Sequence, residues 1–325
     1  MADSILRAEK ARTAFVTTPY VSEILKHIDR CRRYSRFDAE PICMMVFGAH
    51  GVGKSSIIKK YIKQNDGDSD SDGDIVPVVD IVLKENAKPI DAAREILLKL
   101  NDPLALHEKD EMILTKRIVD LVFRLKIELF IIDEFQHLVE KSSNKILHEV
   151  GDWLKILIHK TKCPVVLFGM PYSQVVLNSN SQLRSRFSVQ FHLRPFSFHN
   201  GGAIFTKFLQ SLDRALPFEN SARLDDEAMV RKLYAFSAGN MRSLRDLIYY
   251  ASLNAIENGR DPIAISDFIY ASQLMSGGKP NTWKNPFEKG VKIPDTMFND
   301  PPRTLGWEDY LRNNKTKKID LNSLI

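Results

Sequence analysis

A glycine-rich segment near the start of the chain limits its possible folds more than any other feature. Residues 48–55 read Gly-Ala-His-Gly-Val-Gly-Lys-Ser and fit the pattern G-x-x-x-x-G-K-[ST]. The apolar run at 42–47 is typical of a buried strand, and the sequence predicts a helix over about 53–64. A strand, this pattern and a helix together indicate a phosphate-binding loop, whereas an ordinary glycine turn would leave Lys54 unexplained.

The chemistry of such a loop assigns roles to its residues. Glycines let the backbone curl so that N–H groups face the β-phosphate, while Lys54 neutralises phosphate charge and Ser55 offers a hydroxyl to Mg²⁺. The start of the following helix adds partial positive charge. The sequence therefore predicts a bound nucleotide and Mg²⁺, and the loop residues predicted to bind them are Gly48, His50, Gly51, Val52, Gly53, Lys54, Ser55 and Ser56.

A second apolar run, at 129–132, ends in the carboxylates Asp133 and Glu134. Strands of a parallel sheet covered on both faces read as continuous apolar runs, and their carboxyl ends line the ligand crevice. We therefore expect Asp133 to contribute to the nucleotide and Mg²⁺ site and Glu134 to polarise the attacking water. The alternative, in which both acids merely begin a helix, is disfavoured because the upstream loop requires an acidic partner.

Length and composition are those of a globular protein with more than one unit. The chain has 325 residues, which suggests two or three units, and 44% of them are hydrophobic. It contains no apolar run near the length of a membrane span, and the first residues lack a signal pattern. We therefore expect a cytoplasmic protein without a membrane partner. The net charge of +5 permits contact with nucleic acid without requiring it.

Two features that could suggest metal binding or disulfides are better explained otherwise. The cysteines Cys31, Cys43 and Cys163 are odd in number and widely spaced, which favours reduced core residues. Residues 66–74 resemble the first half of a calcium loop. A loop starting at Asp68 would need glutamate at position 79, which is valine, so we predict a mobile acidic surface loop instead.

The order of predicted elements divides the chain. Strands alternate with helices up to Pro195, which indicates a parallel α/β sheet, and only helices follow. The predicted strands are 42–47, 75–83, 127–132, 164–169 and 188–193. The predicted helices after the phosphate-binding loop are 90–100, 110–126 and 144–161, followed by 197–213, 225–237, 241–257 and 264–275.

These elements predict four segments. Residues 1–40 form a helical lead with an amphipathic helix from about residue 19, residues 41–195 form the α/β core, and residues 196–275 form an all-helical lid. Residues 276–325 are rich in Pro, Asn and Lys with isolated aromatics, and cannot bury a core alone. This tail is expected to wrap the protein itself or to dock on a partner.

Three arginines are placed where a nucleotide switch would use them. Arg186, and as second choice Arg184, precede the last strand, where a ring-forming switch presents an arginine to its neighbour's γ-phosphate. Arg242 lies in the first turn of a helix, where the helix dipole disfavours a cation, so a bound phosphate would explain it. The alternative for all three is a plain surface arginine.

The order of these motifs resembles the AAA+ ATPases of the initiator and clamp-loader branch. Within that branch the chain resembles the TniB/TnsC transposition regulators, most of all the compact TnsC proteins of CRISPR-associated transposons. The grounds for this narrower resemblance are the short N-terminal lead, Asp-Glu-Phe-Gln-His-Leu at 133–138, Phe-Gly-Met-Pro at 168–171 and a tail without a further folded domain. The resemblance covers about residues 15–275.

This resemblance implies an α/β fold of the AAA+ P-loop NTPase class, with a five-stranded parallel sheet, a small helical lid and an extended tail. It also implies ATP as the nucleotide, with slow, Mg²⁺-dependent and DNA-stimulated hydrolysis that drives disassembly. Family members assemble as hexamer-like or heptamer-like rings or as helical filaments on duplex DNA, without sequence preference. They link a target-selection protein to a transposase in the bacterial cytoplasm, associated with the nucleoid when on DNA.

The resemblance is incomplete at one position and unaligned at others. AAA+ proteins usually place a polar first sensor at the end of the strand that here ends in Gly169, so Ser173 and Gln174 are the candidate substitutes. Family DNA contacts lie between the phosphate-binding loop and the acidic strand. The candidates there, some of which we expect to be only solvated, are Lys84, Lys88, Lys99, Thr115, Lys116 and Arg117.

Two other functions stay open at this point. A replication initiator or helicase loader should carry a winged-helix domain after the lid, for which the roughly 50 residues after 275 are too few and too irregular. A nucleotide-binding adaptor without significant hydrolysis would not need Glu134 or the Ser-Arg-Phe sequence at 185–187.

Overall fold

The computed structural model describes residues 2–35, 40–70, 73–140, 144–178, 180–276 and 284–299. Contacts divide the chain into two compact units, each with its own hydrophobic core. The sheet unit contains residues 19–50 and 54–193. The helical unit contains the chain up to residue 18, residues 51–53 and the described part of 194–303.

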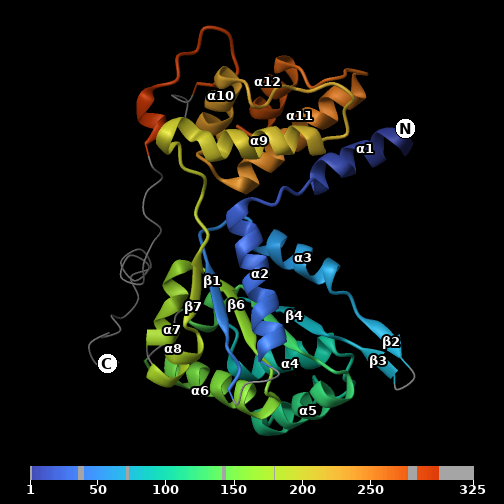
Figure 1. Cartoon of the computed structure of the whole chain (residues 1–325), viewed down its shortest axis with the longest axis vertical. Helices are drawn as coiled ribbons and strands as arrows, with labels where there is room; N and C mark the ends of the chain where they lie inside the picture. The colour runs from blue at the N-terminus through green and yellow to red at the C-terminus, as the bar shows by residue number, and fades with distance from the viewer. Residues whose placement is uncertain are drawn as a thin grey trace. The chain divides into compact units, whose positions relative to one another are not determined.

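Five short parallel strands form the centre of the sheet unit, in the order β4-β5-β6-β1-β7 (Figure 1). β5 and β6 are buried along their whole length and β1 is buried except at Phe47, as the continuous apolar runs predicted. Because all five strands run parallel, their carboxyl ends share one edge of the sheet. The bounds are β1 Met44–Phe47, β4 Val78–Val82, β5 Leu129–Asp133, β6 Val165–Gly169 and β7 Val189–His192.

Helices surround this sheet. α4, α5 and α6 contact one another, and α2 contacts α3 (Figure 1). α2 buries Ile24, Ile28 and Cys31, which recur at helical spacing and so lie on one face of the helix. Among the described residues no helix is long and apolar enough to cross a membrane. The bounds are α2 Pro19–Tyr34, α3 Lys54–Gln64, α4 Pro89–Lys99, α5 Glu111–Arg124, η1 Phe135–Leu138, α6 Asn144–Thr161, η2 Pro171–Gln174, α7 Val175–Asn178 and α8 Ser181–Arg186.

The acidic segment forms a hairpin where the sequence predicted only a loop. β2 (Asp68–Asp70) pairs antiparallel with β3 (Gly73–Ile75), and the predicted strand at 75–83 is replaced by β3 and the separate strand β4. Pro77 lies between these two strands, and its missing N–H cannot extend a ladder. The described residues contain no group of three or more His, Cys, Asp or Glu placed to hold a metal ion.

The helical unit is built around aromatic residues. Phe205, Phe268 and Phe287 are buried at its centre. α1 contacts α11 and buries Ala8 and Ala11. These small apolar residues are too weak a pattern for the sequence to have predicted this helix. The bounds are α1 Ala2–Thr13, η3 His199–Gly202, α9 Ala203–Ala215, α10 Glu227–Ser237, α11 Met241–Glu257, α12 Ile265–Leu274 and η4 Asp295–Phe298.

The boundary between the two units falls within the predicted lead, and the predicted tail is described only in part. Residues 2–18 belong to the helical unit, and α2 belongs to the sheet unit. Residues 284–299 of the predicted tail pack on the helical unit: Phe287 is 1% exposed, and the Phe298 ring lies 4.6 Å from the Phe198 ring, centroid to centroid. This stretch therefore wraps its own chain. The rest of the predicted tail, 277–283 and 300–325, lies outside the described residues.

Candidate nucleotide-binding site

The phosphate-binding loop connects the end of β1 to the start of α3. Gly51 and Gly53 have φ values of +77° and +103°, a region that glycine adopts without the steric cost of a Cβ. Lys54 is the first residue of α3 and is only 6% exposed. Its Nζ donates to the carbonyl oxygens of Gly48 (2.7 Å) and Ala49 (3.0 Å). The lysine charge is thus held over the loop backbone.

The other predicted loop residues differ in exposure. His50 is exposed, Ser56 is half-buried and Val52 is buried, so Val52 can act only through its backbone or through packing. Residues 51–53 group with the helical unit, within which the amide of Arg242 donates to the carbonyl oxygen of Gly51 (2.9 Å).

The loop and the acidic strand meet through one hydrogen bond. Ser55 Oγ donates to Asp133 Oδ2 at 2.9 Å, and the amide of Glu134 donates to the other carboxylate oxygen, Oδ1, at 2.8 Å. Asp133 is 4% exposed, and burial raises its pKa, although both hydrogen bonds act in the opposite direction. The structure therefore places a hydroxyl and a carboxylate oxygen side by side at the sheet edge.

Glu134 follows directly and is held by a residue that the sequence analysis did not single out. Its backbone is left-handed, with φ +55° and ψ +37°. Gln136 is 1% exposed, and its Nε2 donates to Glu134 Oε2. Its Oε1 accepts from the amide of Met170, after β6, at 3.2 Å. The spacing Asp-Glu-x-Gln is visible in the sequence, but no local pattern predicts that the side-chain amide of Gln136 hydrogen-bonds to Glu134.

The two candidate first sensors make other contacts. Ser173 is fully buried, and its Oγ donates to the Met170 carbonyl oxygen at 2.6 Å. Gln174 Nε2 donates to Gln190 Oε1 on β7 at 2.8 Å. Among the described residues, neither side chain hydrogen-bonds to Glu134.

The two arginines of α8 lie in different surroundings. Arg186 is largely buried, with 14% of its side chain exposed, and its Nη2 donates to Glu40 Oε1 at 2.9 Å. This hydrogen bond and the arginine charge lower the pKa of Glu40. Arg184 is exposed. The helix begins after Asn180, whose side chain accepts from the amides of residues 182 and 183.

Arg242 lies in the first turn of α11, as predicted. Asn240 is the N-cap of this helix, and its Oδ1 accepts from the amides of Arg242 (3.0 Å) and Ser243 (3.2 Å). Gly239 precedes this cap with φ +71°, in the left-handed region that favours glycine. The cap fixes where the helix, and with it Arg242, begins.

Sequence comparison then decides the family. A family model described as "Bacterial TniB protein" matches residues 7–197, more than half of the chain. The chain belongs to the TniB family. This confirms the resemblance at family level. No curated protein matches this TniB-family chain.

Solved structures show that the TniB-family chain has the fold of AAA+ P-loop NTPases. The Aeropyrum pernix ORC2 protein (ADPNP-ADP complexes) has a TM-score of 0.56 and 13% identity, covering 81% of this chain and 68% of that one. Cdc6p from Pyrobaculum aerophilum has 0.55 and 16%, covering 80% and 68%. The A. pernix ORC1 protein in complex with DNA has 0.55 and 15%, covering 80% and 66%. The predicted fold class is thus confirmed.

The predicted DNA contacts of the TniB-family chain are not equally accessible. Thr115 is buried and its Oγ1 donates to the Glu111 carbonyl oxygen at 2.8 Å, so this hydroxyl faces its own helix and not a surface ligand. Arg117 forms a two-pronged ion pair with Asp102. Lys84 and Lys99 pair with acidic neighbours at 2.6 and 2.8 Å, and Lys88 and Lys116 are exposed.

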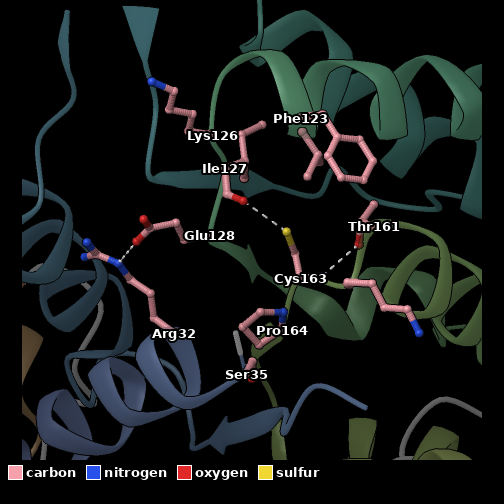
Figure 2. Close-up of a pocket in the computed structure, with 11 residues that line it drawn as sticks. Arg32, Ser35, Phe123, Lys126, Ile127, Glu128, Thr161, Cys163 and Pro164 are labelled. Carbon is pink, nitrogen blue, oxygen red and sulfur yellow. Dashed lines mark hydrogen bonds and ion pairs between the residues drawn. The ribbon is translucent and has the colours of Figure 1, made fainter. Parts of the chain in front are cut away.

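A pocket of about 250 Å³ in the same unit is separate from this site (Figure 2). It is lined by residues that precede β5 and β6, at the edge of the sheet opposite Asp133. Arg32 Nε donates to Glu128 Oε2 there at 2.6 Å, and Cys163 Sγ donates to the Ile127 carbonyl oxygen at 3.1 Å (Figure 2). None of the predicted nucleotide-binding residues lines it.

Proposed function

We propose that this chain is an ATPase whose nucleotide state controls its assembly on duplex DNA, as a regulator of bacterial DNA transposition. The hydrogen bond between Ser55 and Asp133 carries the first half of this proposal. It joins the phosphate-binding loop to the acidic strand, two segments far apart in sequence, in the arrangement that ATP hydrolysis requires.

The residues at this edge fit Mg²⁺. Mg²⁺ prefers oxygen ligands and is usually held by one or two protein groups, together with waters and the substrate phosphates. Ser55 Oγ and the Asp133 carboxylate are oxygen donors 2.9 Å apart, and they would hold the ion. When bound, Mg²⁺ neutralises the negative charge of the phosphates during transfer.

The proposed chemistry is attack of water on the γ-phosphorus of ATP, with ADP as leaving group. Glu134 accepts the proton of the attacking water, and Lys54 stabilises the charge on the phosphate oxygens. An arginine of α8 acts on the nucleotide of a neighbouring copy. Its exposure supports Arg184 over Arg186 for this step, since Arg186 is engaged with Glu40. Arg242 senses the nucleotide from α11.

The proposal of DNA association rests on the family and on surface cations. The ORC1 protein of similar fold was solved in complex with DNA. In this chain, the exposed Lys88 and Lys116 are the best candidates for contacts to DNA phosphates. Lys84, Lys99 and Arg117 come next, because each would have to give up its ion pair with an acidic residue of the same chain to bind a phosphate. Such contacts give no base preference and make affinity fall steeply with salt.

The proposed partners are other copies of the chain, in a ring or filament, together with a transposase and a target-selection protein. The segment 300–325 is our candidate for contact with the transposase. A chain ending at residue 299 keeps Phe287 and Phe298, which pack on the helical unit. It should retain ATP-dependent DNA binding and lose transposition. Loss of both activities would instead assign this segment a structural role.

The test of the central proposal is electron microscopy with duplex DNA, with and without a slowly hydrolysed ATP analogue, followed by disassembly kinetics with ATP. We expect rings or filaments on DNA only with nucleotide. Glu134→Gln should keep these assemblies on DNA long after ATP addition, because the water is no longer deprotonated. Glu149→Gln, at an exposed side chain of α6, is the control. Equal disassembly rates for Glu134→Gln and the parent chain would refute the role of Glu134.

A further inference from the structure

We propose that Gln136 is the positioning residue of the general base Glu134, in place of a polar side chain at the end of β6. This inference rests on the proposed ATPase function. Gln136 spans two strand ends: its amide N–H₂ group donates to the Glu134 carboxylate after β5, and its carbonyl oxygen accepts from the Met170 amide after β6. Both ends of the side chain are therefore fixed, which restricts the carboxylate it holds.

A side chain at the end of β6 would crowd the fully buried Ser173. A Cβ on Gly169 would lie 2.7 Å from Ser173 Oγ, closer than real Cβ contacts allow. It would also lie 3.4 Å from Gln136 Oε1 and 3.4 Å from Phe135 Cβ. The glycine and the glutamine are thus complementary: Gly169 supplies no side chain at the position usually occupied by a first sensor, and Gln136 approaches that position from η1, which follows the neighbouring strand β5.

The backbone of Glu134 gives independent support. The left-handed region is sterically unfavourable for a non-glycine residue, and such residues persist mainly where the surroundings hold them, often at functional sites. Here the Glu134 amide donates to Asp133 Oδ1, and its carboxylate is bound by Gln136. The turn directs the side chain of Glu134 away from the strand and toward the amide of Gln136, so backbone and side chain are restrained together.

The segment that carries Gln136 is itself anchored. Glu140 accepts from the Tyr172 hydroxyl through Oε1, and its Oε2 lies 2.8 Å from His137 Nδ1. The amide of Glu140 donates to the Gln136 carbonyl oxygen at 2.8 Å. These contacts connect the η1 segment to η2 and restrain the turn that carries Gln136. A positioning residue requires a rigid support of this kind.

The test is a double-mutant cycle on ATP turnover with duplex DNA present. Gln136→Met keeps the volume of the side chain but cannot donate to the carboxylate. We expect it to lower kcat by about 100-fold, with fluorescent ATP-analogue affinity and unfolding temperature close to those of the parent. Because Gln136 acts through Glu134, it should cause no further loss in a Glu134→Gln background. Ser252→Ala, at a fully buried serine of α11, is the control and should change kcat little.

Different failures have different meanings. If Gln136→Met and Ser252→Ala have equally small effects on kcat, the inference is overturned while the ATPase proposal stands. If Gln136→Met weakens ATP-analogue binding, or if its loss multiplies with that of Glu134→Gln, Gln136 is structural and the inference is also overturned. If the parent chain hydrolyses ATP but Glu134→Gln does so equally well, the proposed base itself is wrong. Gln136→Glu, which retains shape but not the donor, should reproduce the loss in Gln136→Met.

Discussion

Gly239→Ala is the substitution that tests the packing of the helical unit most directly. Gly239 joins α10 to α11 with φ +71°, and its carbonyl oxygen accepts from the Phe196 amide at 2.9 Å. A Cβ on residue 239 would lie 2.0 Å from the Phe196 carbonyl oxygen and 3.0 Å from its nitrogen. These are backbone atoms, so the clash cannot be relieved by rotating a side chain.

The expected cost has three parts. The left-handed conformation costs alanine roughly 1–2 kcal/mol. Backbone displacement to relieve the overlap adds about 1–3 kcal/mol, and weakening the hydrogen bond to Phe196 adds about 1 kcal/mol. Gly259→Ala is the matched control, because Gly259 has φ +64° but no atom within 4 Å of the added Cβ. We therefore expect a loss of roughly 3–6 kcal/mol at residue 239 and roughly 1–2 kcal/mol at residue 259.

Native-state hydrogen exchange is the suitable assay, because it reports opening free energies for individual segments in a chain with two units. Peptides from α9 to α11 should show the loss in Gly239→Ala and a much smaller one in Gly259→Ala, while peptides from β5 and β6 should be unaffected. Equal losses for the two variants would refute the packing argument, because only the conformational cost would then remain.

Three further predictions concern the sheet unit. Burial raises the pKa of Cys31 and of Cys43 to about 12, so thiol reagents at mildly alkaline pH should label neither until denaturant is added; fast labelling of the folded chain would contradict their burial. Arg184→Ala should lower DNA-stimulated ATP turnover at least about 10³-fold and spare ATP-analogue affinity, whereas Arg186→Ala, which loses its pair with Glu40 and the packing of a largely buried side chain, should have a far smaller effect on turnover; the reverse order would return the trans role to Arg186. Lys116→Ala should reduce the slope of log affinity for DNA against log salt by about 1, and an unchanged slope would exclude that contact.

The sequence alone was sufficient to predict the features that depend on contiguous residues. The phosphate-binding loop, the acidic strand ending at Asp133 and the parallel sheet all follow from contiguous patterns, and the pairing of Ser55 with Asp133 follows from parallel strands sharing an edge. The helix boundary before Arg242 was also predictable, because Gly239 and Asn240 are strong local signals.

Features that depend on distant contacts were not predictable in this way. Gln136 is two residues from Glu134, yet its function depends on the Met170 amide after another strand. The burial of Arg186 against Glu40 likewise joins residues far apart in sequence. α1 has few apolar residues, and the hairpin at 68–75 is polar, so hydrophobic periodicity gave no signal for either.

The seating of Phe287 and Phe298 has a mechanical consequence. These aromatic rings fasten the chain to the helical unit shortly before residue 300, so the terminal 26 residues have their point of origin on that unit. Fully extended, 26 residues span at most about 90 Å. A partner that binds this segment, as proposed, would therefore be tethered to the helical unit, within about 90 Å of residue 299.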